Sequence, residues 1–169
     1  MGQSSPPSLG QGRGAPLLTR AATAADAAQI ARHRRLMFDS MGVGDPVRND
    51  AMDAAALAYL PGAIATGEYR GWMVVAPDGR VVAGAGLSVM QLLATPFSPS
   101  GQFTYLMSLY VEPPFRRRGI ARHLVATMVE WSRAHGYRDI RLHASEQGRR
   151  LYESLGFRQT NEMRLLMPE

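Results

Sequence analysis

The chain has 169 residues, a net charge of +5 at pH 7, and neither cysteine nor lysine. The lack of cysteine excludes disulfides, thiolate catalysis and zinc sites built from cysteine. The lack of lysine excludes Schiff-base chemistry and a Walker-A phosphate loop, so any phosphate must be recognised by arginine and main-chain N–H groups.

Residues 1–15 are rich in Gly, Ser, Pro and Gln and contain almost nothing to bury. This composition predicts a disordered lead-in, followed by a single domain over residues 16–169. The N-terminus lacks the apolar block of a signal peptide, and no stretch approaches the ~18 apolar residues of a membrane helix. We therefore expect a cytoplasmic protein with no membrane partner.

A short strand is expected over residues 17–21. Thr23 followed by Asp26 resembles a capping arrangement, and helical spacing of apolar residues then continues up to Gly42. Three consecutive polar residues are assigned to the solvated side of this first helix: His33, Arg34 and Arg35.

A second helix is expected after a loop over residues 42–49. Asp50 and Asp53 should open this helix, and its buried face has apolar residues at helical spacing: Leu57, Leu60 and Ile64. Pro61 and Gly62 inside the pattern predict a kink or an early end.

Two strands, over residues 69–76 and 80–93, are joined by the hairpin signal Pro77-Asp78-Gly79. After a loop over residues 94–102, Phe103 to Val111 is apolar and aromatic with almost no charge, which is typical of a strand buried on both faces. Pro113-Pro114 then ends the strand, because proline cannot donate to a sheet ladder.

Residues 116–121 read Arg-Arg-Arg-Gly-Ile-Ala and open a helix that should reach His135, with Gly136 as its stop. The first N–H groups of a helix have no internal partner, and the helix dipole adds positive charge there. Arginine can hold a phosphate with two bonds, while Gly119 and Ala121 allow close approach to the backbone. The sequence predicts a phosphate or diphosphate site here. The alternative is a solvated basic turn before an ordinary amphipathic helix.

The C-terminal part predicts a strand over residues 139–145, a short helix from about Gln147 to Gly156, and one or two strands from Phe157 to Met167. The complete order describes an α/β fold with helices on a mixed sheet. Outside residues 116–118 the arginines are scattered, and no RNA-binding or helix-turn-helix pattern is present, so no nucleic-acid partner is expected.

Three segments make the sequence resemble the GNAT superfamily of N-acetyltransferases. Ser108 to Ala121 fits its strand followed by Arg/Gln-x-x-Gly-x-Gly/Ala, and Ala144 to Phe157 fits its helix ending in Leu-Tyr-x-x-x-Gly-Phe. Thr19 to Asp26 is similar to its opening strand and helix. The resemblance implies a three-layer fold with a mixed sheet of about six to seven strands, splayed at a cofactor cleft and flanked by about four helices.

The resemblance also implies acetyl-CoA as co-substrate and assigns residues to it. Main-chain N–H groups after the double proline would hold the diphosphate, and the strand before it would pair with the pantetheine arm. The implied cofactor-binding residues are Leu109, Tyr110, Val111, Arg116, Arg117, Arg118, Gly119, Ile120, Ala121 and Ser145, the last where many relatives have asparagine. Tyr152 stands where the family places its general acid, with a packing role beside Leu151 as the alternative.

The implied activity is acetylation of a small primary amine by direct attack in a ternary complex. Relatives with a glutamate base have it where this chain shows Thr104, Met107 or Ser108, so a water relay or a carboxylate from the loop around residues 42–53 would have to accept the proton. Two alternatives stay open: a non-catalytic acyl-CoA-binding or regulatory module, and acetylation of a protein or peptide amine. No histidine pair has metal-ligand spacing, so no metal is expected. Dimers are common in this family, and no residue of the sequence demonstrates one.

Overall fold

The computed structural model describes residues 16–167, so the expected disordered lead-in over 1–15 lies outside the described residues. The sheet has five strands in the order β1-β2-β3-β4-β5. Their bounds are Leu18–Ala21 (β1), Tyr69–Val75 (β2), Val81–Gln91 (β3), Gln102–Val111 (β4) and Ile140–Leu142 (β5). Strands β1 to β4 are antiparallel and β5 runs parallel to β4. This mixed sheet confirms the predicted fold class, with fewer strands than expected.

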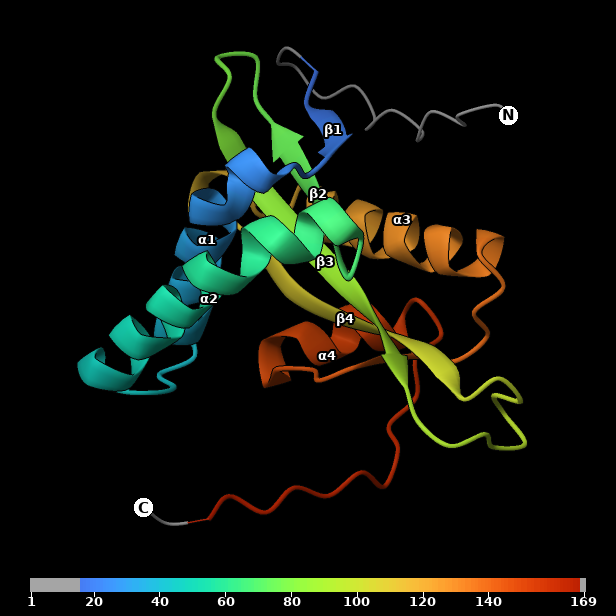
Figure 1. The fold of residues 1–169 in the computed structure, drawn as a ribbon. Coiled ribbons are helices and arrows are strands. Elements are labelled where there is room, and N and C mark those ends of the chain that lie inside the picture. The colour runs from blue at the N-terminus through green and yellow to red at the C-terminus, as the bar shows by residue number, and fades with distance from the viewer. Residues whose placement is uncertain (1–15, 168–169) are drawn as a thin grey trace.

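Four α-helices pack on the sheet: Ala27–Ser40 (α1), Pro46–Thr66 (α2), Ile120–Ala134 (α3) and Glu146–Glu153 (α4). Two 3-10 turns, Ala24–Asp26 (η1) and Pro113–Phe115 (η2), precede α1 and α3. Figure 1 shows α1 and α2 side by side, with α3 on the other side of the sheet. No helix within the described range is both long and apolar enough to cross a bilayer.

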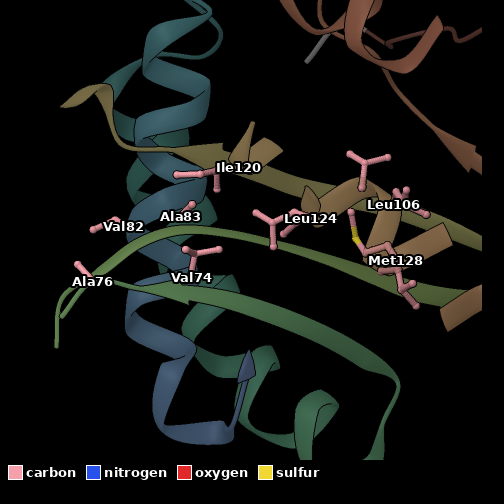
Figure 2. Close-up of a cluster of buried hydrophobic side chains, with 11 residues drawn as sticks. Val74, Ala76, Val82, Ala83, Leu106, Ile120, Leu124 and Met128 are labelled. Carbon is pink, nitrogen blue, oxygen red and sulfur yellow. The ribbon is translucent and has the colours of Figure 1, made fainter. Parts of the chain in front are cut away.

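Alternating strand residues send apolar side chains into two separate clusters. Val74 belongs to the cluster under α3, where Ile120, Leu124 and Met128 meet the strands (Figure 2). Its neighbour Met73 points to the opposite cluster, under α1 and α2. Burial of each large apolar side chain contributes roughly 1.5–3 kcal/mol, so both faces of the sheet are held by their helices.

The structure contradicts the assignment of His33 to the solvated side of α1, because only 2% of this residue is exposed. Its ring lies 5.1 Å from the Tyr110 ring, and its Nε2 lies 2.8 Å from the side-chain nitrogen of Gln29 and 3.6 Å from Glu112. Burial lowers the pKa of His33. The prediction failed because arginines surround His33 in the sequence and make the local pattern polar. The residue is buried by a tertiary contact with β4, which a local pattern does not record.

Helix α2 begins earlier and continues further than the sequence predicted. Asp45 caps its first turn by accepting a hydrogen bond from the N–H of Arg48 at 3.0 Å, and proline follows the cap, where its missing N–H costs little. The helix passes through Pro61 to Thr66, so an early end is wrong. Leu57, expected on the buried face, is 46% exposed. Its carbonyl lacks the hydrogen bond that the N–H of residue 61 would have donated, because proline has no N–H.

The predicted C-terminal strands are absent from the described part of the chain. Strand β5 has only three paired residues, shorter than the expected 139–145, and residues 157–167 form no regular element. Four apolar residues of that segment are 73–95% exposed: Met163, Leu165, Leu166 and Met167. Phe157, at its start, is half-buried. An apolar pattern makes a strand only when a neighbouring strand offers its hydrogen-bonding edge, and no such pairing forms here.

Candidate active site

The turn between β4 and α3 is built by proline and by two left-handed residues. The double proline ends the ladder and forms η2, after which Nε of Arg116 donates to the carbonyl oxygen of Val111 at 2.9 Å. Its guanidinium also lies 5.6 Å from the centre of the Tyr110 ring. Arg117 and Gly119 adopt φ values of 63° and 79°, which turn the chain into α3. A left-handed arginine is strained, as often occurs at functional sites.

Main-chain N–H groups line the start of α3 without an acceptor. From Arg117 to Arg122, none of these groups donates to another residue within 16–167, and Gly119 gives no side-chain cap. The helix ladder starts only with His123, whose N–H bonds to Gly119 at 3.0 Å. A Cβ added at Gly119 would meet no atom within 4 Å, so the space beside the turn is open. Free N–H groups at a helix N-terminus favour an anion.

A hollow next to this turn brings in arginines that the sequence analysis did not single out. Arg117 lines it together with residues of α4: Glu146, Gln147, Arg149, Arg150 and Glu153. Arg149 donates to Gln159 at 2.8 Å, whereas Arg117 and Arg150 have no side-chain partner among the described residues. The sequence did contain a signal for this basic hollow, namely the adjacent pair Arg149-Arg150 in the segment from Ala144 to Phe157.

Strand β4 loses its neighbour halfway along its length. Its pairing with β5 ends at Leu106 opposite Leu142, so no strand of the described chain pairs with the stretch from Met107 to Val111 on that side. On its other side the register skips between Gly84 and Gly86, and Ser108 has a left-handed φ of 59°. Such a bulge releases main-chain groups from the ladder. The strand therefore offers free hydrogen-bonding groups on the predicted stretch from Leu109 to Val111.

Tyr152 on α4 is half-buried, with its ring edge-on to Phe157 at 5.8 Å between centres. Burial raises the pKa of Tyr152, and its hydroxyl has no hydrogen-bond partner in the described chain. Gly148, one turn earlier, makes room for this ring, because a Cβ there would come within 3.1 Å of it. Ser145 instead caps α4 by accepting from the N–H of Gly148 at 3.1 Å, so its hydroxyl already has a structural role.

A second polar cluster lies at the bulge, on the side of α1 and α2. Nη1 of Arg34 donates to the hydroxyl oxygen of Ser108 at 2.9 Å. Buried Tyr69 is next to them, and burial raises the pKa of its phenol to about 12 although Ser108 and the charge of Arg34 lower it. The Tyr69 hydroxyl occupies the space where a Cβ at Gly86 would lie. Tyr69 is therefore a neutral donor at ordinary pH and not a base.

The positions that could hold a general base are occupied by other contacts. Thr104 is fully buried and shares a hydrogen bond with Ser132 at 2.9 Å, and Met107 packs in the apolar cluster under α1 and α2. In the loop and first turns of α2, Asp50 and Asp53 both bind Arg35 at 2.8 Å. The carboxylates of Asp50 and Asp53 are thus engaged with Arg35, although Oδ1 of Asp53 is buried without a hydrogen-bond partner among the described residues. Across the described residues, no three His, Asp or Glu side chains gather in the manner of metal ligands.

These features define an open-sheet α/β protein with a row of unbonded N–H groups where a strand turns into a helix. The sequence profile of the acetyltransferase (GNAT) family matches residues 36–157. The chain belongs to this family, which confirms the resemblance found in its sequence.

Solved structures share the whole fold. A GCN5-related N-acetyltransferase from Ralstonia eutropha JMP134 is 31% identical with a TM-score of 0.84, over 89% of this chain and 98% of that one. A predicted acetyltransferase from Clostridium acetobutylicum, solved with acetyl-CoA, has a TM-score of 0.82 at 22% identity, over 89% of this chain and 96% of the other. At that identity the second comparison shows the fold alone.

Among curated proteins, a glucosamine 6-phosphate N-acetyltransferase of Trypanosoma brucei brucei is 32% identical over 91 residues. The match covers 53% of this chain and 59% of that relative, so it extends over little more than half of either protein.

Proposed function

We propose that the chain transfers the acetyl group of acetyl-CoA to the primary amine of a small molecule, by direct attack in a ternary complex. The observation that carries this proposal is the row of unbonded N–H groups from Arg117 to Arg122, directly after the part of β4 that β5 leaves free. A diphosphate is bound well by such donors, and an extended arm is bound well by such an edge. Here the two features adjoin.

The residues fit acetyl-CoA, which would supply an acetyl group activated as a thioester. N–H groups from Arg117 to Ala121 would hold the diphosphate, and the guanidinium groups of Arg117 and Arg118 would add positive charge. Main-chain groups of Leu109 to Val111 would pair with the pantetheine arm. Arg116 would act mainly by fixing the turn, because its Nε is bound to Val111. Ser145 would contribute less than expected, because its hydroxyl caps α4.

In the transfer step a bond forms between the amine nitrogen and the acetyl carbon, and the carbon–sulfur bond breaks. A main-chain N–H near Leu109 would donate to the carbonyl oxygen as it gains negative charge. Tyr152 would give its phenolic proton to the departing sulfur, and water would take a proton from the amine nitrogen before Tyr152 is reprotonated from solvent. The raised pKa of Tyr152 keeps this proton in place at neutral pH.

A free-thiol assay with a panel of amines tests the proposed reaction. Glucosamine 6-phosphate heads the panel because of the Trypanosoma relative, followed by glucosamine, simple alkylamines and a peptide with a free N-terminus. We expect thiol release that depends on a small amine, with the acetylated product confirmed by mass spectrometry. Binding of acetyl-CoA without thiol release would instead support the non-catalytic module, and release with the peptide alone would support a protein substrate.

Replacement of Tyr152 by phenylalanine tests the general acid. Loss of general acid catalysis usually lowers a rate by 10²–10⁴-fold, so Tyr152→Phe should reduce kcat by about this factor while acetyl-CoA still binds. Tyr137→Phe is the matched control, because Tyr137 stacks on Trp131 at 6.0 Å beyond the end of α3. An unchanged kcat in Tyr152→Phe would leave Tyr152 with a packing role only.

A further inference from the structure

We propose that Arg34 binds an anionic group, phosphate or carboxylate, on the acceptor amine. This inference rests on the proposed acetyl transfer and specifies the class of its acceptor. The starting observation concerns the arginines that precede β4. Most of those that the structure describes form an ion pair with a carboxylate, whereas Arg34 does not.

Arginines before β4 are mostly neutralised by acidic residues. The pairs are Arg20 with Asp26, Arg32 with Glu112, Arg35 with Asp39, Asp50 and Asp53, Arg48 with Asp45, and Arg80 with Asp78. Within the described residues, Arg34 and Arg70 have no carboxylate oxygen within 4.0 Å. Arg70 is exposed and lies over the Trp131 ring at 4.8 Å. Arg34 is thus the half-buried guanidinium of this region that has no counter-ion.

Arg34 is also held in place, although no carboxylate within residues 16–167 neutralises it. One N–H group donates to Ser108, and the guanidinium carbon lies 5.5 Å from the centre of the Phe38 ring. Most of the five N–H donors of its guanidinium group remain available to another partner. Their planar arrangement suits the oxygens of a phosphate or a carboxylate. A partly desolvated charge without a counter-ion costs free energy, which a bound anion would offset.

The position of Arg34 relates this donor set to the proposed reaction. Its partner Ser108 is the left-handed residue of the β4 bulge, next to the free edge on which the thioester would lie. The guanidinium therefore contacts, through its hydrogen bond to Ser108, the strand segment where an amine would attack. Tyr69 beside it is a neutral phenol, because its pKa is about 12, and cannot serve as the counter-ion. An acceptor that carries its own negative charge would complete the site.

Matched amines with and without an anionic group test the inference in the intact protein. Phosphoethanolamine and β-alanine provide the phosphate and the carboxylate, and ethanolamine and propylamine are their neutral counterparts. We expect the wild type to use one anionic amine with a kcat/KM about 10- to 100-fold above its neutral counterpart, as for one charge-assisted contact. Arg34→Gln should remove this preference through KM, and Arg34→Lys should retain part of it. Arg70→Gln, which also removes an arginine without a carboxylate partner, should change neither parameter.

The outcomes separate this inference from the proposed function. Equal use of anionic and neutral amines by the wild type overturns the role of Arg34 while acetyl transfer stands. An equal loss of kcat for all amines in Arg34→Gln also overturns it, since Arg34 would then act on the reaction centre. Thiol release with no amine, although calorimetry shows acetyl-CoA bound, overturns the transferase itself. The wild-type comparison needs no variant, so the test holds even if Arg34→Gln fails to fold.

Discussion

The two sides of the sheet use polar groups in different ways. On the side of α1 and α2, most donors and acceptors form closed networks, such as Arg20 with Asp26 and Arg35 with Asp53. The exceptions there are Arg34, which has no carboxylate partner, and two buried atoms without a hydrogen bond in the described chain, Nδ1 of His33 and Oδ1 of Asp53. Between α3 and α4, the N–H groups after Arg116 are unbonded, and the Tyr152 hydroxyl has no partner among the described residues. The closed networks stabilise the fold. The open groups are available to a ligand, and for this reason we propose that the co-substrate binds there.

The contrast has an energetic consequence. Arg117 and Arg150 line one hollow, and like charges that share a site repel unless an anion lies between them. Glu146 and Glu153 line the same hollow and offset part of this repulsion. Removal of these arginines should therefore weaken acetyl-CoA binding without loss of fold stability. Removal of a group from a closed network should lower the stability of the fold and leave acetyl-CoA binding unchanged.

The largest effect is expected for Arg117→Gln/Arg150→Gln. Two charge-assisted contacts to phosphate, at about 1.5 kcal/mol each, would raise the Kd for acetyl-CoA roughly 100-fold. The melting temperature should stay the same or rise, because two like charges are removed. Isothermal calorimetry and thermal denaturation measure the two quantities on the same samples.

The matched control is Arg133→Gln/Arg138→Gln, which removes two arginines at and beyond the other end of α3. This variant has the same net charge, so a general loss of electrostatic attraction would weaken binding equally in both proteins. A similar Kd in the two variants would mean that the hollow beside Arg117 is not where the phosphates bind.

A glycine pair tests the closed side of the sheet. Gly86→Ala would force a methyl group into the space of the buried Tyr69 hydroxyl, and overpacking of this kind costs about 2 kcal/mol. Gly62→Ala on α2 meets no atom within 4 Å and should raise stability by about 0.5–1 kcal/mol, because alanine is the better helix former. Urea unfolding should give shifts of opposite sign. A neutral result at Gly86 would show that Tyr69 moves freely.

Local signals in the sequence were sufficient for the turn into α3. Proline, glycine and an apolar period of four residues act over short distances, so this helix and its stop at Gly136 were predicted correctly. The helix begins at Ile120, however, because residues 116–119 form the turn that the sequence analysis had counted as its first residues. The same holds for the hairpin between β2 and β3 and for the helix that ends before Gly156.

Tertiary contacts explain what the sequence could not show. His33 lies within a polar run, and only its packing against Tyr110 buries it. Met163 to Met167 has an apolar composition that suits a strand, but a strand needs an edge to pair with. The unpaired state of Arg34 and the hollow lined by Arg150 depend on which residues are absent nearby in space, and no local pattern records that.

The last prediction concerns acid and the closed network at η1, where the expected effect does not exceed that of Gly86→Ala. Hydrogen bonds from the side chain of Arg20, and further ones from Thr23, lower the pKa of Asp26 to about 2. Burial of the carboxylate acts in the opposite direction and raises the pKa, but its effect is smaller than the sum of the hydrogen bonds. A carboxylate whose pKa is lowered by folding stabilises the protein above its unfolded pKa of 3.8, and this contribution is lost as the pH falls toward 2. The shift corresponds to roughly 1–2 kcal/mol, because Arg20 is partly exposed and solvent screens the pair.

Asp26→Asn should therefore be less stable than the wild type at pH 5 by about this amount, and the difference should shrink as the pH approaches 2. Urea midpoints measured between these pH values provide the test. Glu130→Gln on α3 is the control, because Glu130 forms no ion pair in the part of the chain that the structure describes. A difference that stays constant with pH would mean that Asp26 stabilises η1 through its shape and hydrogen bonds, which asparagine disturbs, and not through its charge. The closed network would then depend on geometry alone, and the contrast with the open arginines beside α3 would no longer be one of charge compensation.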